Sequence, residues 1–292
     1  MKLRKPTNKG KKDVSEIIIP NSINNVISFL PNFYSEHFGF LYGIKDGGRI
    51  YIGSLSHLNP TDVKEISPKE LNLEGESGQR YIKLHNKICE QGEKLFPNFT
   101  QVAYHSHPKL LSRDFTKTEK QEILSQFPKF KDNLEELVKQ LDNAFLSEAD
   151  KEFAKKYSSH GTMILSLGKE KDLRNINSKY FHSDFFHSLY TTYIFEIAKS
   201  FFTDNKTRLM GFQVDKNKNT WEMPVTIAEN TGAYIDEKKC YQVMEKMKPF
   251  NKMHLEYIKS FKKDYAKKYP VHFKIFMSAL EKFQIEINEE RF

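Results

Sequence analysis

The chain has 292 residues, of which 38% are hydrophobic and 29% are charged, a balance typical of a globular protein with an aqueous surface. This length is large for one compact core, so we expect one main domain enlarged by insertions or followed by a smaller helical unit. No segment approaches the roughly 18–20 uninterrupted apolar residues of a membrane helix, and no apolar signal segment follows the N-terminus. We therefore expect a cytoplasmic protein with no membrane partner.

The net charge of +8 is concentrated at one end of the chain. Six basic and no acidic residues precede Asp13, so that only about +2 remains for the rest of the chain. This pattern predicts a flexible basic tail over residues 1–15, a kind of tail that more often solubilises a protein than binds phosphate. Nucleic acid is accordingly not an expected partner.

The chain contains two cysteines, Cys89 and Cys240, which are too few for a disulfide framework and lack C-x-x-C spacing. We expect two reduced thiols. Apolar residues recur at helical spacing around Cys89, which favours a packed side chain over a reactive one. The 24 Phe and 14 Tyr residues predict a core rich in aromatic side chains.

The first half of the chain predicts alternating helices and strands. A helix is expected from residue 21 or 22 to about residue 30, before Pro31. Residues 37–44 and 49–55 predict a hairpin around a Gly-containing turn, followed by a loop to residue 78. An amphipathic helix over 79–96 then leads into a strand at 101–108, which ends in "HSHP".

The second half is predicted to be mainly helical around three strands. A helix begins at Thr116, and residues 130–157 are again helical in pattern, before a strand at 160–168. Residues 208–215 and 221–227 predict a closing strand pair. From Asp236 onward apolar residues recur on single helical faces, which indicates packing against the core or a protein partner.

His105 and His107 raise the question of a metal. Side chains on an extended segment repeat every two residues, so both imidazoles are expected on the same side of the strand. Two neutral imidazoles and one carboxylate are a common ligand set for catalytic zinc, with water in the fourth position. A carboxylate outside the ligand set can then act as general base. The candidates are Glu119 or Asp114 for the third ligand and Glu36 for the base.

These residues resemble the JAMM signature of the JAB-type MPN-domain zinc metalloproteases. The chain shows "SEHFGFLYG", then "HSHP", then a hydroxyl-x-x-acid pair, "TKTE", and the order of elements matches from about residue 16 to about residue 170. The resemblance implies an α/β fold of the cytidine-deaminase-like kind, with a mixed β-sheet flanked by helices. The core would span 16–228 with a helical insertion at about 127–158, and residues 229–292 would form a helical C-terminal extension.

The resemblance also implies a role for each matching residue. His105 and His107 would bind one zinc ion per chain with Glu119, Glu36 would be the general acid/base, and Thr116 would position the water and the oxyanion. Thr116 and Glu119 stand where the family has Ser and Asp, and the preceding loop is one residue longer.

Two alternatives remain open for this part of the signature. Thr116 and Glu119 also fit a helix capping box, in which neither residue is needed at a metal site. In that case Asp114 would be the third ligand with Ser112 in the oxyanion role, or the site would have no third acidic ligand.

By resemblance, the function would be hydrolysis of the amide bond after ubiquitin or a ubiquitin-like protein. The substrate tail would add as a strand beside the site, and the loop at 56–78 and the insertion would form the recognition surface. The frequent Lys, Asn, Ile and Phe indicate a bacterial member, for which delivery into a host cell is one route to such a substrate. The alternatives are a non-catalytic MPN scaffold and, less favoured, a metal-dependent nuclease.

Overall fold

The structure of the chain is a computed structural model that describes residues 3–6, 14–29, 37–58, 76–107, 117–118, 120–121, 133, 146, 148–167, 208–228 and 235–268. Within its helices and strands, no side-chain placement is described for Phe29, Glu76, Ser77, His107, Arg208, Ile235 or residues 261–268.

The described elements alternate between strands and helices along the chain. In order they are β1 (Glu16–Pro20), α1 (Asn21–Phe29), β2 (Phe38–Asp46), β3 (Arg49–His57), α2 (Glu76–Leu95), β4 (Phe99–His107), α5 (Glu148–Tyr157), the short 3-10 helix η5 (Ser159–Gly161), β5 (Thr162–Leu167), β6 (Arg208–Val214), β7 (Thr220–Met223), β8 (Val225–Ala228) and α7 (Ile235–Lys268).

The strands form one mixed sheet of eight in the order β7-β6-β5-β4-β2-β3-β1-β8. The pairs β4–β5, β1–β3 and β1–β8 are parallel, and the other neighbours are antiparallel. β7 and β8 are separated only by Pro224, yet they pair with β6 and β1, which lie towards opposite ends of the strand order. Pro224 has no N–H to donate, but its carbonyl accepts a 3.0 Å bond from the Ile17 N–H. This short extended segment therefore draws the two ends of a strongly curved sheet together.

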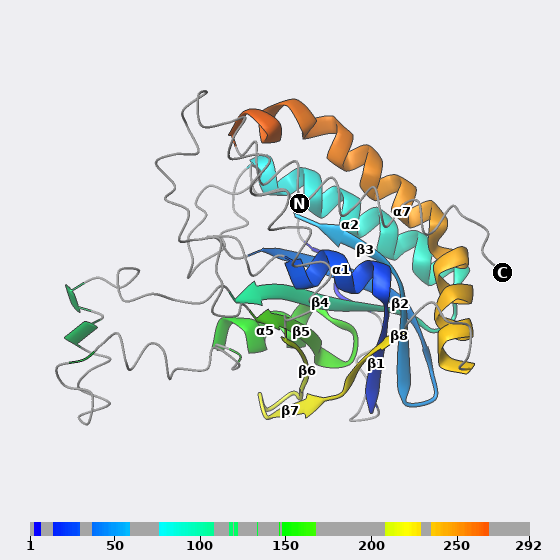
Figure 1. The fold of residues 1–292 in the computed structure, drawn as a ribbon, viewed down its shortest axis with the longest axis horizontal. Coiled ribbons are helices and arrows are strands. Elements are labelled where there is room, and N and C mark those ends of the chain that lie inside the picture. Colours follow the sequence, from blue (N-terminus) through cyan, green and yellow to red (C-terminus); the bar gives the residue numbers. More distant parts are fainter. Residues whose placement is uncertain are drawn as a thin grey trace.

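The helix α7 takes the place of a strand along part of β3. β1 pairs with β3 only as far as Tyr51, and beyond that residue α7 lies against β3, with α2 beside it (Figure 1). The approach is so close that a Cβ on Gly53 would lie 2.7 Å from the backbone oxygen of Val243. The core between these elements is aromatic, as the composition predicts, and its largest fully buried side chains include Tyr42, Tyr81, Tyr104, Phe40 and Phe250.

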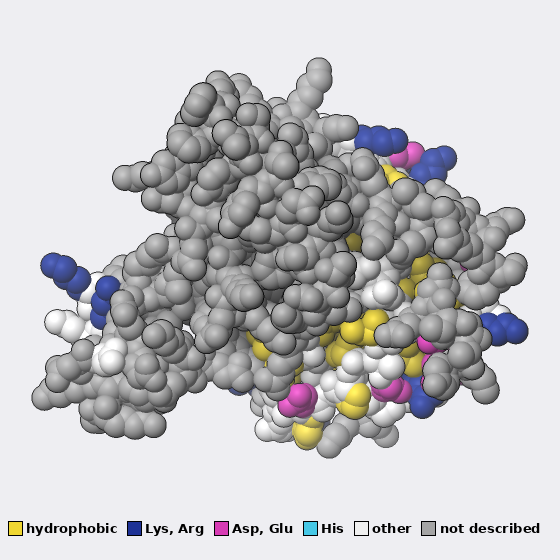
Figure 2. All heavy atoms as spheres, in the orientation of Figure 1, with side chains coloured by type: hydrophobic (Ala, Val, Ile, Leu, Met, Phe, Trp, Pro, Cys, Tyr) yellow, Lys and Arg dark blue, Asp and Glu magenta, His cyan; other side chains and the backbone are white. Residues whose placement is uncertain are grey.

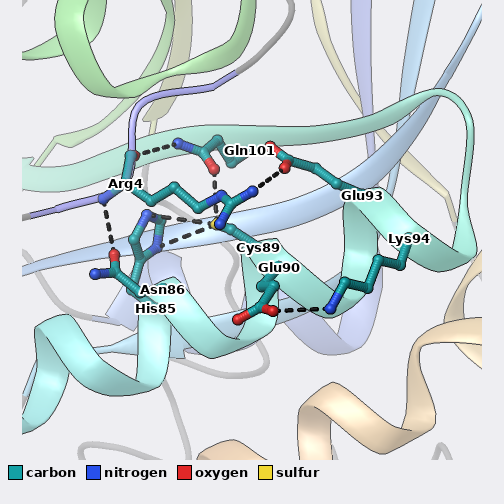
Figure 3. Close-up of polar contacts among 8 residues, drawn as sticks. All are labelled: Arg4, His85, Asn86, Cys89, Glu90, Glu93, Lys94 and Gln101. Carbon is teal, nitrogen blue, oxygen red and sulfur yellow. Dashed lines mark hydrogen bonds and ion pairs between the residues drawn. The ribbon is translucent and has the colours of Figure 1, made fainter.

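The N-terminal residues 3–6 lie against α2. The Arg4 backbone N–H donates to Asn86 Oδ1 at 2.7 Å, and its guanidinium donates to Glu93 Oε2 at 2.6 Å (Figure 3). Gln101 of β4 donates from Nε2 to the Arg4 carbonyl. Nearer β1, the Ser15 N–H donates to Gly48 O. Within the predicted flexible tail over 1–15, residues 3–6 and 14–15 therefore have specific partners. Residues 1–2 and 7–13 lie outside the described part, so the tail as a whole stays a prediction.

The predicted α/β class, a mixed sheet flanked by helices, is confirmed, while the MPN assignment stays a prediction. The hairpin, the helix before "HSHP" and the strand that ends in it form as β2–β3, α2 and β4, within a few residues of the expected bounds. Residues 148–157, the end of the predicted helical insertion, are helical and form α5, which packs on β4, β5 and β6. Most of residues 108–147 lie outside the described part.

Among the helices that the structure describes, none is both long enough and apolar enough to cross a membrane.

Replacing Gly53 by Ala should destabilise the protein because the new methyl group would press on the α7 backbone rather than on a flexible side chain. We expect a loss of about 1–3 kcal/mol in the free energy of unfolding, measured by urea denaturation. Lys246→Ala, an exposed position on α7, is the control and should change stability by less than about 0.5 kcal/mol. Equal stabilities for the two variants would show that α7 does not approach β3 this closely.

Candidate functional site

The candidate site lies at the carboxyl end of β4, between β2 and β5. In this register His105 is opposite Phe38 of β2 and beside Leu165 of β5. Side chains alternate along the strand, so His105 lies on the same face as Gln101, which faces α2. His105 is buried, with 8% of its surface exposed, whereas the side chain of His107 lies outside the description. The prediction that both histidines end one strand is confirmed.

The structure brings an unpredicted carboxylate to His105. Asp150, in the first turn of α5, places Oδ1 3.6 Å from His105 Nε2. Both side chains are largely shielded, at 10% and 14% exposed. Among the described residues, no group of three or more His, Cys, Asp and Glu side chains gathers at ligand distance. The described part of the site is therefore this pair.

Packing and hydrogen bonds hold α5 in place on the sheet. The Phe153 ring packs edge-on against Phe38, with the ring centroids 4.9 Å apart. At the carboxyl end, the Ser158 hydroxyl accepts from the Ala103 N–H at 3.0 Å, and the Ser159 hydroxyl accepts from the Gln101 N–H at 2.9 Å. These contacts tie α5 to β2 and β4, and so fix the position of Asp150 relative to His105.

The β6–β7 turn supports the exposed side of α5. Lys218 lies 2.9 Å from Glu152 and 3.3 Å from Glu148. These carboxylates are about half exposed or more, so each pair contributes little by itself. The single ammonium group of Lys218 thus pairs with two successive turns of α5. Asp150 is on the other side of the helix, which faces β4.

The sequence contains a signal for Asp150. Ser147-Glu148-Ala149-Asp150 has the Ser-x-x-Asp spacing and, unlike "TKTE", the residue types of the JAMM signature. About 40 residues separate this stretch from His107, so spacing along the chain does not connect the two. Among the predicted site residues, Glu36, Thr116 and Glu119 lie outside the described residues, as do Ser112 and Asp114, so their roles stay predictions.

Ser106, between the two histidines, joins β4 to the residue that follows Glu36. Its hydroxyl accepts from the His37 N–H at 2.8 Å, and its own N–H donates to the His37 carbonyl at 2.8 Å. Ser106 is fully buried and His37 is 2% exposed. The backbone immediately after Glu36 is therefore held beside the histidine strand, although 69 residues separate the two segments.

The ring of His37 begins a chain of buried polar groups. Its Nδ1 lies 3.2 Å from His57 Nε2, and the other His57 nitrogen, Nδ1, lies 3.0 Å from the Tyr104 hydroxyl. A Cβ on Gly39 would lie 2.6 Å from that hydroxyl and 2.1 Å from Ser56 O. Glycine is therefore required at residue 39 for Tyr104 to reach across β2 to β3. His37 is a packed core residue.

Burial keeps these groups in their neutral forms at neutral pH. It lowers the pKa of His37, His85 and His254 to about 3 and raises the pKa of the Tyr104 hydroxyl. Cys89 is fully buried beside His85 and donates to Gln101 Oε1 at 2.7 Å (Figure 3). Burial raises the pKa of this thiol, so Cys89 is packed rather than nucleophilic, as predicted.

The described basic side chains are not gathered on the face shown in Figure 2. Lys and Arg stand at separate places along its outline, with acidic side chains among them.

Comparison with known proteins gives only weak structural similarity. No family model matches the chain, and no curated protein matches it. The solved structures that it resembles include the solution structure of protein DSY2949 from Desulfitobacterium hafniense, with a TM-score of 0.33 and 11% sequence identity, over 75% of this chain and 97% of that one. Similarity at this level supports no conclusion about fold or function.

Replacing Ser106 by Ala should destabilise the protein by about 1–3 kcal/mol, because the buried His37 N–H loses the hydroxyl that accepts from it. Urea denaturation at pH 7.5 measures this loss. Ser15→Ala removes an exposed hydroxyl bond to Gly48 O and should cost less than about 0.5 kcal/mol. If the two substitutions cost the same, the Ser106 hydroxyl does not hold His37.

As the pH falls, the free energy of unfolding should fall more steeply than the protonation of carboxylates alone would cause. His37, His85 and His254 have a pKa of about 3 when folded, whereas the ordinary histidine value is 6.5. Between these values the unfolded chain binds more protons, so the free energy of unfolding falls as the pH falls, by up to about 1.4 kcal/mol per pH unit for each histidine.

Urea denaturation between pH 6.5 and 4.5 tests this. His85→Gln should make the free energy of unfolding less dependent on pH, by the contribution of one histidine. An unchanged slope would mean that His85 protonates without unfolding.

Proposed function

We propose that the protein is a zinc-dependent isopeptidase or peptidase of the JAMM type, and that Asp150 is its third zinc ligand. One observation carries the proposal: His105 Nε2 and Asp150 Oδ1 converge to 3.6 Å at the end of the His-x-His strand. These two residues are 45 positions apart in the sequence, and β4 and α5 meet there through the contacts described above.

The donor geometry fits a tetrahedral zinc ion. Nitrogen and oxygen ligands lie about 2.0–2.2 Å from zinc, so two of them around one tetrahedral ion are roughly 3.3–3.6 Å apart. The separation of 3.6 Å between His105 and Asp150 agrees with this range. With the alternation of an extended strand, His107 would share this face and complete a set of two imidazoles and one carboxylate. The shielding of both described donors favours binding, because few waters compete there.

The first turn of a helix suits a carboxylate ligand. Asp150 lies in the first turn of α5, near the positive end of the helix dipole. Its short side chain leaves few rotamers to be lost when an ion is bound. Ser147, three residues earlier, carries the hydroxyl that the JAMM signature has at that spacing. We therefore propose Ser147 and Asp150 for the roles first assigned to Thr116 and Glu119.

The protein's own residues would carry out binding, orientation and proton transfer. Zinc, when bound, supplies Lewis acidity that activates water and polarises the scissile carbonyl. Glu36 would accept a proton from the attacking water and deliver it to the leaving nitrogen. An extended backbone at residues 36–38 would place Glu36 on the face of Phe38, which is the face of His105. The link from Ser106 to His37 supports that placement.

The substrate class comes from the resemblance and is proposed on that basis. It is an extended tail of ubiquitin or of a ubiquitin-like protein, linked through its terminal carbonyl to an amine. A protein that folds normally but binds no zinc would instead fit the scaffold alternative.

Zinc content tests the ligand set directly. Wild type purified in metal-free buffer should hold one zinc per chain by mass spectrometry, and Asp150→Ala should bind zinc at least about 100-fold more weakly, since even outer-shell changes cost 10- to 100-fold. Glu148→Ala, an exposed carboxylate in the same turn, is the matched control and should keep the metal. Glu119→Ala and Asp114→Ala should also keep it. Loss in either of these two, with Asp150→Ala unaffected, would rule out Asp150.

Hydrolysis tests the activity. The zinc-loaded protein should cleave at least one substrate among diubiquitins of different linkage and precursors of ubiquitin-like proteins. Glu36→Gln should keep its zinc but lose at least about 100-fold in kcat, because the proton acceptor is gone. A zinc-loaded wild type with no cleavage of this panel would contradict the proposed substrate class, and an active Glu36→Gln would contradict the role of Glu36.

A further inference from the structure

We propose that helix α7 is a working part of the candidate site, in which His254 positions the acid/base Glu36 through His57 and His37. The inference rests on the proposed function, since it assigns Glu36 that role. In this inference α7 has a functional role in addition to packing. It also identifies three buried histidines as positioning residues, none of which is a proposed ligand.

The first link joins α7 to the end of β3. Beyond Tyr51 no described strand covers this side of β3, and side chains of α7 meet its polar groups instead. The His57 N–H donates to His254 Nε2 at 2.9 Å. One turn earlier on α7, Asn251 Oδ1 accepts from the Ser54 hydroxyl at 2.6 Å. The position of His57 is therefore set by α7.

The second link passes through the ring of His57. The rings of His57 and His37 are stacked, 5.2 Å apart, and their nearest nitrogens are 3.2 Å apart. The Tyr104 hydroxyl lies 3.0 Å from the other nitrogen of His57 and donates to Ser56 O. With that direction, His57 donates from Nδ1 to Tyr104 and accepts at Nε2 from His37. Both ring nitrogens of His57 thus have partners, which restricts rotation of the ring.

The third link reaches the site. His37 is held at its ring by His57 and at its backbone by Ser106, the residue between the two histidines of β4. Glu36 is the next residue in the chain, so its Cα lies only about 3.8 Å from the Cα of His37. A shift of His37 is therefore passed to the Glu36 backbone. General acid/base catalysis is sensitive to such a shift, because a misplacement of about 1 Å can cost 100-fold in rate.

Burial makes the bond between α7 and β3 important for the position of His57. His254 accepts at Nε2 from the His57 backbone N–H, so its proton is on Nδ1. His37 and His254 are both buried to 2% exposure and stay uncharged at neutral pH. Removing the His254 acceptor would cost the buried His57 N–H this bond, and the end of β3 would have to shift to recover it.

The test compares three variants of the full-length zinc-loaded protein. His254→Leu removes the acceptor, and His254→Gln retains one, because the glutamine carbonyl reaches about as far as Nε2. Ser54→Ala is the matched control, since it breaks the neighbouring bond between β3 and α7 without touching the histidine chain. The first readout is hydrogen exchange of the His37 amide relative to that of Leu41 in the middle of β2. It requires no substrate.

We expect His254→Leu to speed His37 exchange, relative to Leu41, by at least about tenfold, while His254→Gln and Ser54→Ala stay within about twofold of wild type. On a cleaved diubiquitin, His254→Leu should lower kcat on the order of 10- to 100-fold with KM unchanged and zinc retained. His254→Gln should restore most of kcat. If His254→Leu does not fold, His254→Asn replaces it, because its carbonyl is one methylene too short.

Unchanged relative exchange in His254→Leu, or equal acceleration in Ser54→Ala, would overturn the inference. So would a normal kcat in a variant whose His37 exchange is accelerated. A wild type that cleaves no diubiquitin is a separate outcome. It would remove the proposed function, and with it the catalytic role of the coupling, while the exchange measurement would still decide whether α7 controls His37.

Discussion

The antiparallel pairing of β2 with β4 is the constraint on which the rest of the site depends. In this register Phe38 lies opposite His105. Ser106 accepts a hydrogen bond from the His37 N–H and donates one to the His37 carbonyl. A slip of one residue would turn His105 to the other face of the sheet, away from α5. The buried rings of Phe38 and Phe40, packed against α2 and α5, oppose such a slip, because it would take them out of the core.

The long segment between β4 and α5 does not loosen the site. Closing a loop of this length costs only slightly more than closing a short one, since the entropy grows with the logarithm of its length. The contacts that hold α5 on the sheet come from the helix itself and from the two residues that follow it. Phe153 packs in the core, and Ser158 and Ser159 accept from two N–H groups of β4. The chain can therefore carry a large insertion between the histidines and Asp150 without moving either.

A layer of buried polar side chains connects parts of the core that are usually joined by apolar contacts alone. Ser56 is its centre, since its hydroxyl meets both the Tyr42 and the Tyr81 hydroxyls, and its carbonyl accepts from Tyr104. Removing such groups from water is costly, and each hydrogen bond recovers part of that cost. Such a layer tolerates few alternative packings, so it favours one arrangement of β2, β3, β4 and their helices.

The sequence by itself determined the class of fold and half of the candidate site. Periodicity located the helices and strands, since apolar residues recur every 3.6 or 2 positions according to the element. His-x-His at a strand end predicted two imidazoles on one face. Asp150 required the tertiary structure. Spacing along the chain shows neighbours within one element, whereas His105 and Asp150 meet across about 40 intervening residues, through the packing of α5 on the sheet. The role of α7 was hidden for the same reason. His254 shows no partner in the sequence, and only the close approach of α7 to Gly53 brings it to the backbone of His57.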